Sequence, residues 1–327
     1  MKAVLVKEPG GPEQLQIVEV PDPVPGPGEV AIDIHAAALN RADLLQRRGL
    51  YPPPPGTTDI LGLECAGVVS ALGPGCTGNV RVGERVMALL GGGGYAERVV
   101  VPEGIAMKVP DALDLEAAAA IPEAFLTARE ALFTTGELGA TDSVLIHAAA
   151  GGVGSAALQL ARRAGARVFA TAGGAEKCAW VRALGADTVI DYKSEDFAAV
   201  IQARTAGQGV NVILDFVGAA YAEKHAACLA TRGRHVVIGV LGGAQASVNF
   251  GKLIQKRQSL RGVVMRSRSS QEKIELSRAF VRTTLPLLAD GRLKALVDST
   301  FPLAEVARAH ERMESNANLG KIVLRVR

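Results

Sequence analysis

The sequence predicts an α/β protein of two domains, a β-rich domain and a doubly wound parallel sheet inserted within it. Its 327 residues suffice for two domains of ordinary size. Up to about residue 125, short apolar runs alternate with Gly/Pro turns, whereas strands and helices alternate from 126 to 267. The segment 268–327 resembles the opening region again. We therefore expect the boundaries 1–125 and 126–267, with 268–327 returning to complete the first domain.

The composition narrows the possible classes of function. Hydrophobic residues make up 48% of the chain but aromatic residues only 4%, which disfavours a nucleic-acid surface built on stacked rings. The net charge of +3 is spread thinly, without a long basic run. Four scattered cysteines are typical of reduced thiols in a cytoplasmic protein. We predict a cytoplasmic protein with no nucleic-acid partner and no membrane partner.

In the first domain, each expected strand is a short run that ends at turn residues. The turns PGPG (25–28) and YPPPPG (51–56) cannot continue a strand, because proline lacks the N–H that pairing requires. One helix is predicted at 40–48, and irregular strands of this kind suggest a compact barrel or rolled sheet. The expected strands are 2–6, 15–20, 29–38, 66–72, 85–90 and 96–101.

The middle region alternates between buried strands and helices, as a doubly wound parallel sheet requires. The helices expected between its strands include 152–164 and 175–184, and the segment 241–258 opens with a Gly-rich loop. The expected strands are 143–148, 167–172, 187–192, 210–217, 233–240 and 259–265. After residue 267 we expect a helix at 271–289, a strand at 296–301, a helix at 303–314 and a strand at 321–326.

The glycine turn AAGGVG (149–154) lies between the first of these strands and its helix. Gly151 occupies the place where the backbone approaches a pyrophosphate, and Gly154 the place where the helix packs against the strand. The helix N-terminus offers free N–H groups to the anion. Ala149 stands at the first glycine position of the usual motif, so a purely structural turn remains the alternative. The predicted cofactor contacts are Ala150, Gly151, Gly152, Val153 and Gly154.

The end of the second strand indicates which dinucleotide is bound. NAD-binding proteins usually carry a carboxylate there for the ribose hydroxyls. This chain has Ala172 and Gly173 instead, followed by Lys177 one helical turn later. Glu176 is the one acid nearby, and at a helix start it can simply favour the helix dipole. We predict that the cofactor is NADPH, with Ala172, Gly173 and Lys177 in contact with it.

Five segments indicate a family: ALNRADLLQRRGLYPPPPG (38–56), LGLECAGVV (61–69), AAAIPEAFLTA (118–128), VLIHAAAGGVGSAALQLA (144–161) and GKIVL (320–324). Together they resemble the quinone oxidoreductase branch of the medium-chain dehydrogenases/reductases, and within it the p53-inducible, zeta-crystallin-like type. The resemblance covers essentially the whole chain. It implies a chaperonin-10-like (GroES-like) β domain with an inserted Rossmann domain, an active site in the cleft between them, and a zinc-independent NADPH:quinone reductase.

The resemblance also implies site residues. Asn40 would face the nicotinamide and the substrate, and Tyr51 would line the cleft; we predict both as catalytic residues. The alternatives are that Asn40 is a helix N-cap and that Tyr51 packs on Pro52–Pro55. The further cofactor contacts that the resemblance implies are Asn40, Thr127, Tyr192, Phe216, Val217, Gly218, Gly239, Leu241, Val264, Met265, Asn318, Gly320 and Lys321.

Zinc-dependent members of this superfamily carry Cys at the position of Asn40 and a His-Glu pair at the position of Leu63 and Glu64. They also carry a closely spaced four-Cys lobe, which this chain lacks. Zinc requires about four N, S or O ligands, so we predict no metal at these positions and a hydrogen-bonding role for Glu64. Without a metal to polarise a carbonyl, an electron-poor acceptor such as a quinone or an activated double bond is the expected substrate.

Several alternatives stay open. The chain could reduce enoyl thioesters, or it could be a non-catalytic nucleotide-sensing, structural or RNA-associated protein. Arg266 and Arg268 are expected to be solvated, and His147 to be packed or hydrogen-bonded; Cys65 and Cys228 read as small buried residues. The apolar strand at 259–265 would form a sheet edge, which predicts a homodimer joined through it.

Overall fold

The computed structural model describes residues 1–327, which form two compact units. Unit 1 comprises Met1–Leu126 and Met265–Arg327, and unit 2 comprises Thr127–Val264. Unit 2 is therefore inserted between two segments of unit 1. The structure divides the chain after residues 126 and 264, whereas the sequence predicted divisions after residues 125 and 267.

Unit 1 is built mainly from β-strands. Its strands are β1 (Lys2–Val6), β2 (Leu15–Glu19), β3 (Glu29–Ala38), β4 (Glu64–Leu72), β5 (Arg85–Leu89), β6 (Arg98–Pro102), β7 (Met107–Lys108), β14 (Val297–Pro302) and β15 (Lys321–Arg325). Its helices are α1 (Arg41–Arg47), α2 (Leu115–Ala119), α9 (Ser270–Thr283), α10 (Leu285–Ala289) and α11 (Val306–Glu314), and α3 (Pro122–Arg129) begins in unit 1 and ends in unit 2. Short 3-10 turns lie at Pro12–Gln14, Glu103–Ile105 and Leu303–Glu305.

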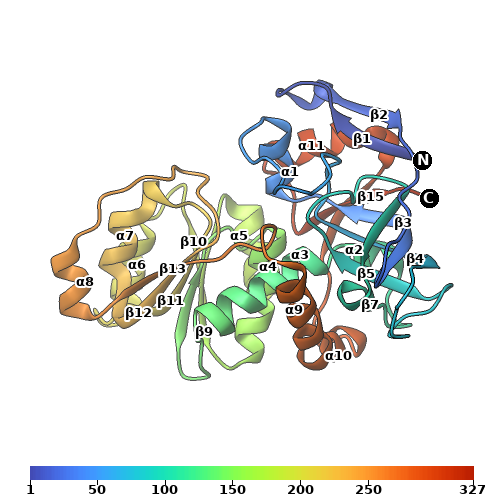
Figure 1. The fold of residues 1–327 in the computed structure, drawn as a ribbon. Helices are drawn as coiled ribbons and strands as arrows, with labels where there is room; N and C mark the ends of the chain where they lie inside the picture. The colour runs from blue at the N-terminus through green and yellow to red at the C-terminus, as the bar shows by residue number, and fades with distance from the viewer. The chain divides into compact units, whose positions relative to one another are not determined.

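The main sheet of unit 1 joins both ends of the chain. Its order is β14-β15-β3-β4-β5-β7, and β6 also pairs with β3. The C-terminal strand β15 lies antiparallel beside β3, so the red end of the chain returns to the blue start (Figure 1). Val30, Ile32 and Ile34 of β3 are fully buried, because alternate residues of a strand point to the same face. The C-terminal segment therefore completes the main sheet of unit 1.

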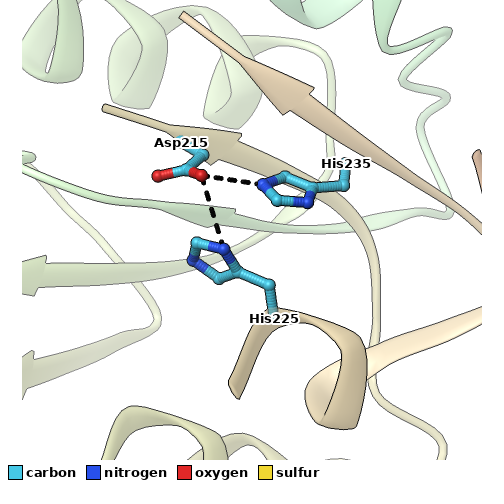
Figure 2. Close-up of side chains that lie close together, drawn as sticks. All are labelled: Asp215, His225 and His235. Carbon is cyan, nitrogen blue, oxygen red and sulfur yellow. Dashed lines mark hydrogen bonds and ion pairs between the residues drawn. The ribbon is translucent and has the colours of Figure 1, made fainter. Parts of the chain in front are cut away.

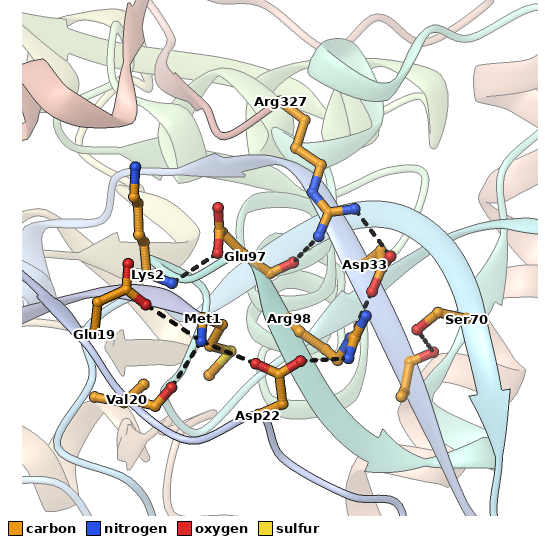
Figure 3. A network of polar contacts seen from close by, with 11 residues as sticks. Met1, Lys2, Glu19, Val20, Asp22, Asp33, Ser70, Glu97, Arg98 and Arg327 are labelled. Atoms are coloured by element: carbon orange, nitrogen blue, oxygen red, sulfur yellow. Dashed lines mark hydrogen bonds and ion pairs between the residues drawn. The ribbon is translucent and has the colours of Figure 1, made fainter.

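A chain of ion pairs ties β3 and β6 of this sheet to the C-terminal residue (Figure 3). Asp33 of β3 accepts a hydrogen bond of 2.6 Å from Arg98 of β6 and one of 2.9 Å from Arg327. Arg98 also contacts Asp22 at 2.8 Å. Burial alone would raise the pKa of Asp33, but the two arginines outweigh it and lower that pKa to about 2.

Unit 2 is a six-stranded parallel sheet with helices packed along it (Figure 1). Its strands are β8 (Ser143–Ile146), β9 (Arg167–Ala172), β10 (Thr188–Asp191), β11 (Val210–Asp215), β12 (Leu229–Val237) and β13 (Ser259–Gly262). Its helices are α4 (Gly152–Arg163), α5 (Ala175–Ala183), α6 (Phe197–Arg204), α7 (Ala222–Cys228) and α8 (Phe250–Lys256), with a π-helical segment at Glu130–Thr135 and a 3-10 turn at Ala219–Tyr221. The predicted doubly wound sheet is confirmed.

The strand order β10-β9-β8-β11-β12-β13 places β8 beside β11 in the middle of the sheet. The chain winds outward in one direction from β8 and in the other from β11. In open α/β sheets of this kind, ligands bind beyond the carboxyl ends of the strands at the point of reversal. The turn after β8 and the loop after β11 therefore mark the candidate cofactor site.

The structure corrects several expected elements. The last strand of the sheet ends at Gly262 rather than at 265, so Val264 and Met265 follow the strand instead of ending it. The strand expected at 233–240 is β12, which begins and ends earlier. The helix expected at 271–289 is broken at Thr284, because Pro286 has no N–H to continue the helical hydrogen bonds. No helix has both the length and the apolar character needed to cross a bilayer.

Candidate cofactor and acceptor sites

The turn between β8 and α4 leaves the first N–H groups of the helix without capping side chains. Gly151 precedes the helix in an extended conformation, and the first turn of α4 contains no acidic residue. A Cβ on Gly154 would lie 2.3 Å from the carbonyl oxygen of Ala148, so only glycine permits the close approach of helix and turn. A Cβ on Gly151 would meet that oxygen only at 3.3 Å. The contact at Gly154 agrees with the packing role that the sequence predicted for it. The uncapped turn also presents N–H groups that suit an anion.

The tip of β9 carries no carboxylate of its own. Gly174, which follows Gly173, has a φ of +90°, and its N–H donates to Asp191 Oδ1 at 3.0 Å. A Cβ on Gly173 would lie 2.6 Å from the hydroxyl of Tyr192, so the two predicted contacts are adjacent. Sequence reasoning did not identify Asp191, whose carboxylate binds backbone N–H groups of Gly174 and Lys193. These hydrogen bonds lower the pKa of Asp191.

The loops after β11 and β12 are joined by backbone hydrogen bonds. Asp215, the last residue of β11, accepts through Oδ1 from the N–H of Val217 at 2.7 Å and of Gly218 at 2.9 Å. The N–H of Leu241 donates to Phe216 O at 3.2 Å. The predicted contacts at 216–218, with Gly239 and Leu241, therefore form one ordered rim at the end of the sheet. Leu241 and Val264 expose about half of their surface, whereas Met265 is buried.

The hydroxyl group of Thr127 is a second feature that fits a bound ligand. Thr127 is 3% exposed, and its Oγ1 has no hydrogen-bond partner in the protein. A buried hydroxyl without a partner costs free energy, so a ligand atom is the natural complement. Together with the free N–H groups of α4, this residue fits a bound dinucleotide.

In unit 1, the side chain of Asn40 belongs to a buried polar cluster that we call the Asn40–Glu64–Lys321 cluster. The amide Nδ2 of Asn40 donates to Glu64 Oε1 at 2.9 Å, and Lys321 Nζ donates to Asn40 Oδ1 at 2.8 Å. Lys321 Nζ also lies 2.6 Å from Glu64 Oε1 and 2.6 Å from Leu39 O. The second oxygen of Glu64 accepts the N–H of Glu123 at 2.8 Å. The hydrogen-bonding role predicted for Glu64 is confirmed.

Asn40 also precedes the first turn of α1, which was the alternative interpretation of this residue. Its backbone N–H donates to Asp43 Oδ2 at 2.7 Å, while its side-chain amide forms hydrogen bonds with Glu64 and Lys321. Asp43 is fully buried and also accepts from the Tyr95 hydroxyl at 2.9 Å. Burial raises the pKa of Asp43 to about 6, since these hydrogen bonds offset the cost only in part. Burial and the charge of Glu64 raise the pKa of Glu123 to about 8.

The structure contradicts the expectation that Arg266 is solvated. Arg266 is 3% exposed, and its guanidinium donates to Gly91 O at 2.8 Å, Tyr51 O at 3.1 Å and Gln46 Oε1 at 2.7 Å. It also lies 5.2 Å from the centre of the Tyr51 ring. Three acceptors from distant segments fix the planar fork, which a sequence pattern cannot show. Burial raises the pKa of Tyr51, and the nearby guanidinium offsets part of that rise.

The remaining predicted contacts at the C-terminus are buried beside the same cluster. Asn318 is 7% exposed, and its Nδ2 donates to Gly320 O at 2.8 Å. Gly320 has a φ of +93°, and a Cβ there would lie 2.3 Å from Leu296 O. Glycine is therefore required for the backbone to turn into β15, which brings Lys321 to Glu64.

Comparison with known proteins places both units in described families. The family described as alcohol dehydrogenase GroES-like domain matches residues 26–111, and the family described as zinc-binding dehydrogenase matches residues 152–281. The human synaptic vesicle membrane protein VAT-1 homolog is 34% identical, over 96% of this chain and 84% of its own length. A mycocerosic acid synthase-like polyketide synthase of Mycobacterium tuberculosis is 38% identical over 207 residues, but the chain spans only 10% of that protein's length.

Solved structures match over the whole chain. The Escherichia coli quinone oxidoreductase complexed with NADPH has a TM-score of 0.89 and 34% identity, with 100% of both chains covered. A protein described as an NAD-dependent alcohol dehydrogenase has a TM-score of 0.88 and 34% identity, also with 100% of both chains covered. The CurK enoyl reductase has a TM-score of 0.86 and 31% identity, with 99% of this chain and 98% of the other covered. These matches support binding of a nicotinamide cofactor.

One of these family descriptions names zinc, and the donor set at the expected catalytic position does not fit that ion. Asn40 and Glu64 are bonded to each other and to Lys321, whose positive charge occupies the place of a cation. Leu63 offers no ligand atom. Cys65 is buried, and the other three cysteines lie on other segments. Zinc needs about four N, S or O ligands, so no step of the reaction is assigned to zinc at this position.

Proposed function

Since the chain belongs to the medium-chain dehydrogenase/reductase superfamily and is an oxidoreductase of that superfamily, we propose that it transfers reducing equivalents from NADPH to a quinone or a related electron-poor acceptor. The observation that carries the proposal is the Asn40–Glu64–Lys321 cluster, in which an ammonium group binds Asn40 and Glu64, two of the positions that the resemblance aligns with zinc ligands. Such a site lacks a Lewis acid to activate an alcohol. A quinone needs no such activation, because it is already electron-poor.

In this proposal unit 2 binds the cofactor, which supplies a hydride when bound. The N–H groups at the start of α4 hold the pyrophosphate, between Gly151 and Gly154. Asp215 fixes the loop at Val217 and Gly218, which lies at the neighbouring strand end. Thr127 contributes its unpartnered hydroxyl. The protein's task here is to hold the dinucleotide in one orientation.

The preference for NADPH over NADH rests on the tip of β9. No carboxylate ends that strand, Asp191 is engaged with Gly174, and Lys177, in the first turn of α5, is the cation that we assign to a 2′-phosphate. A charge-assisted hydrogen bond contributes about 1.5–3 kcal/mol. The variant Lys177→Met is therefore expected to lower kcat/KM for NADPH by about 10-fold to 100-fold and to leave that for NADH unchanged. Lys252→Met, on the surface of α8, is the matched control; equal losses with both cofactors would count against the assignment.

On the acceptor side, Asn40 and Tyr51 have different roles. The amide of Asn40 is already bonded to Glu64 and Lys321, so Asn40 acts as a positioning residue. Tyr51 has a hydroxyl that can donate to an acceptor oxygen, and Arg266 holds its ring and backbone. Tyr51→Phe should lower kcat by about 10-fold or more without raising the KM for NADPH. An unchanged kcat would exclude Tyr51 as a proton donor.

Reduction of enoyl thioesters is the second candidate, because the chain resembles the CurK enoyl reductase and part of a polyketide synthase. The two candidates are separated by following NADPH oxidation with 1,2-naphthoquinone and with a crotonyl thioester at matched concentrations. We expect the quinone to give the higher kcat/KM by at least about tenfold. A preference for the thioester would replace the first candidate by the second. No turnover with either, despite NADPH binding, would favour the non-catalytic alternative.

We also propose a homodimer joined at β13, the edge strand of the parallel sheet. Leu260 and Val264 near this edge are about half exposed, and Phe250 and Ile254 of the adjacent α8 are about 70% exposed. An exposed apolar edge favours pairing with a second copy of the same strand. Sedimentation should give twice the chain mass of 33.9 kDa at micromolar concentration, and Leu260→Lys should give the single mass. A monomeric parent protein would contradict the proposal.

A further inference from the structure

Three of the five histidines gather within unit 2, together with Asp215. Figure 2 shows Asp215 at the end of β11 between the imidazoles of His225 from α7 and His235 from β12. Asp215 Oδ2 lies 2.8 Å from His235 Nε2 and 3.4 Å from His225 Nδ1. One ligand atom from each of the three residues lies within 4.8 Å of the other two.

We propose that Asp215, His225 and His235 form a binding site for one divalent transition-metal ion of the Zn²⁺ type. Two imidazole nitrogens and one carboxylate oxygen are the donor set that such ions prefer. Zinc–ligand distances of about 2.0–2.2 Å need only modest movements of these side chains. The site belongs to unit 2, whereas the Asn40–Glu64–Lys321 cluster belongs to unit 1, and the proposal does not depend on the proposed reaction.

The first argument is that His225 offers a buried nitrogen without a partner. His225 is fully buried, and its Nδ1 makes no hydrogen bond although it faces Asp215 Oδ2. Burying a polar atom without a partner is costly. A metal ion between this nitrogen and the carboxylate oxygen removes that cost.

The second argument concerns the other nitrogen of His225, which is held by His147. The two Nε2 atoms lie 2.8 Å apart, and His147 Nδ1 lies 2.9 Å from Thr171 Oγ1. When His225 carries the shared proton, it donates to His147, which donates to Thr171, and His225 Nδ1 presents a lone pair toward Asp215. Metal-binding histidines commonly donate their second nitrogen to such an outer partner. The expectation that His147 is packed and hydrogen-bonded is thereby confirmed, and the proposal gives it an outer-sphere role.

The surroundings also suit a metal site. The rings of Phe197 and Tyr221 pack against His147 at 4.8 and 5.2 Å between centroids, so the cluster has an apolar wall. A pocket of about 960 Å³ includes Asp215 and His235 in its lining, which provides access and room for a water ligand.

The second oxygen of Asp215 connects this site to the loop at Val217 and Gly218. An ion on Oδ2 restrains the carboxylate whose Oδ1 accepts those two N–H groups. We therefore assign the ion a structural role, as a clamp beneath the loop. It takes no part in transfer of reducing equivalents.

The test is metal binding by the full chain after removal of metal with a chelator. Titration with Zn²⁺ against a chromophoric chelator should show one ion per chain, and Co²⁺ should give the intense visible absorption of a four-coordinate site. His235→Gln, at the partly exposed ligand, should weaken Zn²⁺ binding by more than about 100-fold, because loss of an outer-sphere partner alone costs about 10-fold to 100-fold. His147→Gln should weaken it by that smaller factor. The controls His35→Gln and Cys76→Ser, which alter a histidine and a partly exposed thiol elsewhere, should bind as the parent does.

A second measurement needs no variant. In ¹⁵N NMR of the histidine rings, Zn²⁺ should shift the tautomers of His147 and His225 together, because the shared proton moves to His225 when its Nδ1 binds the ion. No stoichiometric binding would overturn the proposal. The proposal would also be overturned if His235→Gln bound Zn²⁺ as tightly as the parent. The same holds if the ring signals of His147 and His225 did not change when Zn²⁺ is added.

Discussion

The ammonium nitrogen of Lys321 lies 2.6 Å from Glu64 Oε1, and both side chains are buried. A buried ion pair of this kind is strongly destabilised when one partner is removed, since the other charge is left without compensation. Lys321→Met should therefore lower the free energy of unfolding by about 3–5 kcal/mol, measured by urea denaturation. Arg325→Met, on the same strand but in an exposed pair with Glu116, should cost about 0–1 kcal/mol. Equal losses from the two variants would show that the Lys321 pair is not a buried charge pair.

The two glycines of the turn after β8 should respond differently to alanine. A methyl group on Gly154 meets Ala148 O at 2.3 Å and must displace backbone, so Gly154→Ala should lower the free energy of unfolding by about 1–3 kcal/mol. On Gly151 the contact is 3.3 Å, so Gly151→Ala should fold almost normally but weaken NADPH binding by about tenfold or more. Thermal melts and fluorescence titration with NADPH measure the two effects. Normal NADPH affinity in Gly151→Ala would favour a purely structural turn.

The buried fork of Arg266 should matter for the acceptor more than for the cofactor. Lysine cannot reach Gly91 O, Tyr51 O and Gln46 Oε1 with one planar group, so Arg266→Lys should release Tyr51. We expect the KM for the quinone to rise by about tenfold, with the Kd for NADPH unchanged. Arg278→Lys on the surface of α9 is the control. A change confined to NADPH binding would contradict this role.

Asp43 predicts an unusual dependence of stability on pH. Burial raises its pKa to about 6, so between about pH 4 and 6 the folded state holds a proton that the unfolded state has lost. Stability contributed by this group therefore falls as the pH rises through that window, by about 3 kcal/mol in total. The variant Asp43→Asn lacks this group, so its free energy of unfolding should rise relative to that of the parent as the pH increases across this range. Urea denaturation of both proteins at several pH values measures the difference.

Asp33 provides the control of opposite sign. Its pKa is lowered to about 2, so its contribution is present above about pH 4 and is lost as the pH falls toward 2. The difference between the parent and Asp33→Asn should thus shrink on acidification. If Asp43→Asn gave the same direction of change as Asp33→Asn, the buried carboxyl would not have the raised pKa.

Local patterns predicted the strands and the helix after the glycine turn, because apolar runs, Gly/Pro turns and helix starts are encoded within a few residues. Strand ends were less predictable: β13 stops at Gly262 although the apolar run continues to Met265. The broken helix at Thr284 could have been anticipated from Pro286. The inserted topology followed from the similarity between the two ends of the chain.

The sites show where sequence reasoning stops. Asn40 was identified by resemblance, but its partners Glu64 and Lys321 are 24 and 281 positions away and only the fold brings them together. Arg266 was interpreted as solvated for the same reason, since its three acceptors lie on distant loops. Asp215, His225 and His235 are ten residues apart, a spacing that matches no familiar metal motif. A strand, a helix and a further strand place them side by side.

The most direct test of the account is the steady-state oxidation of NADPH and of NADH by the purified chain with 1,2-naphthoquinone as acceptor. We predict turnover whose kcat/KM for NADPH exceeds that for NADH by at least about tenfold, the factor expected from one charge-assisted contact to the 2′-phosphate. Absence of quinone-dependent oxidation, or a clear preference for NADH, would contradict the central claim.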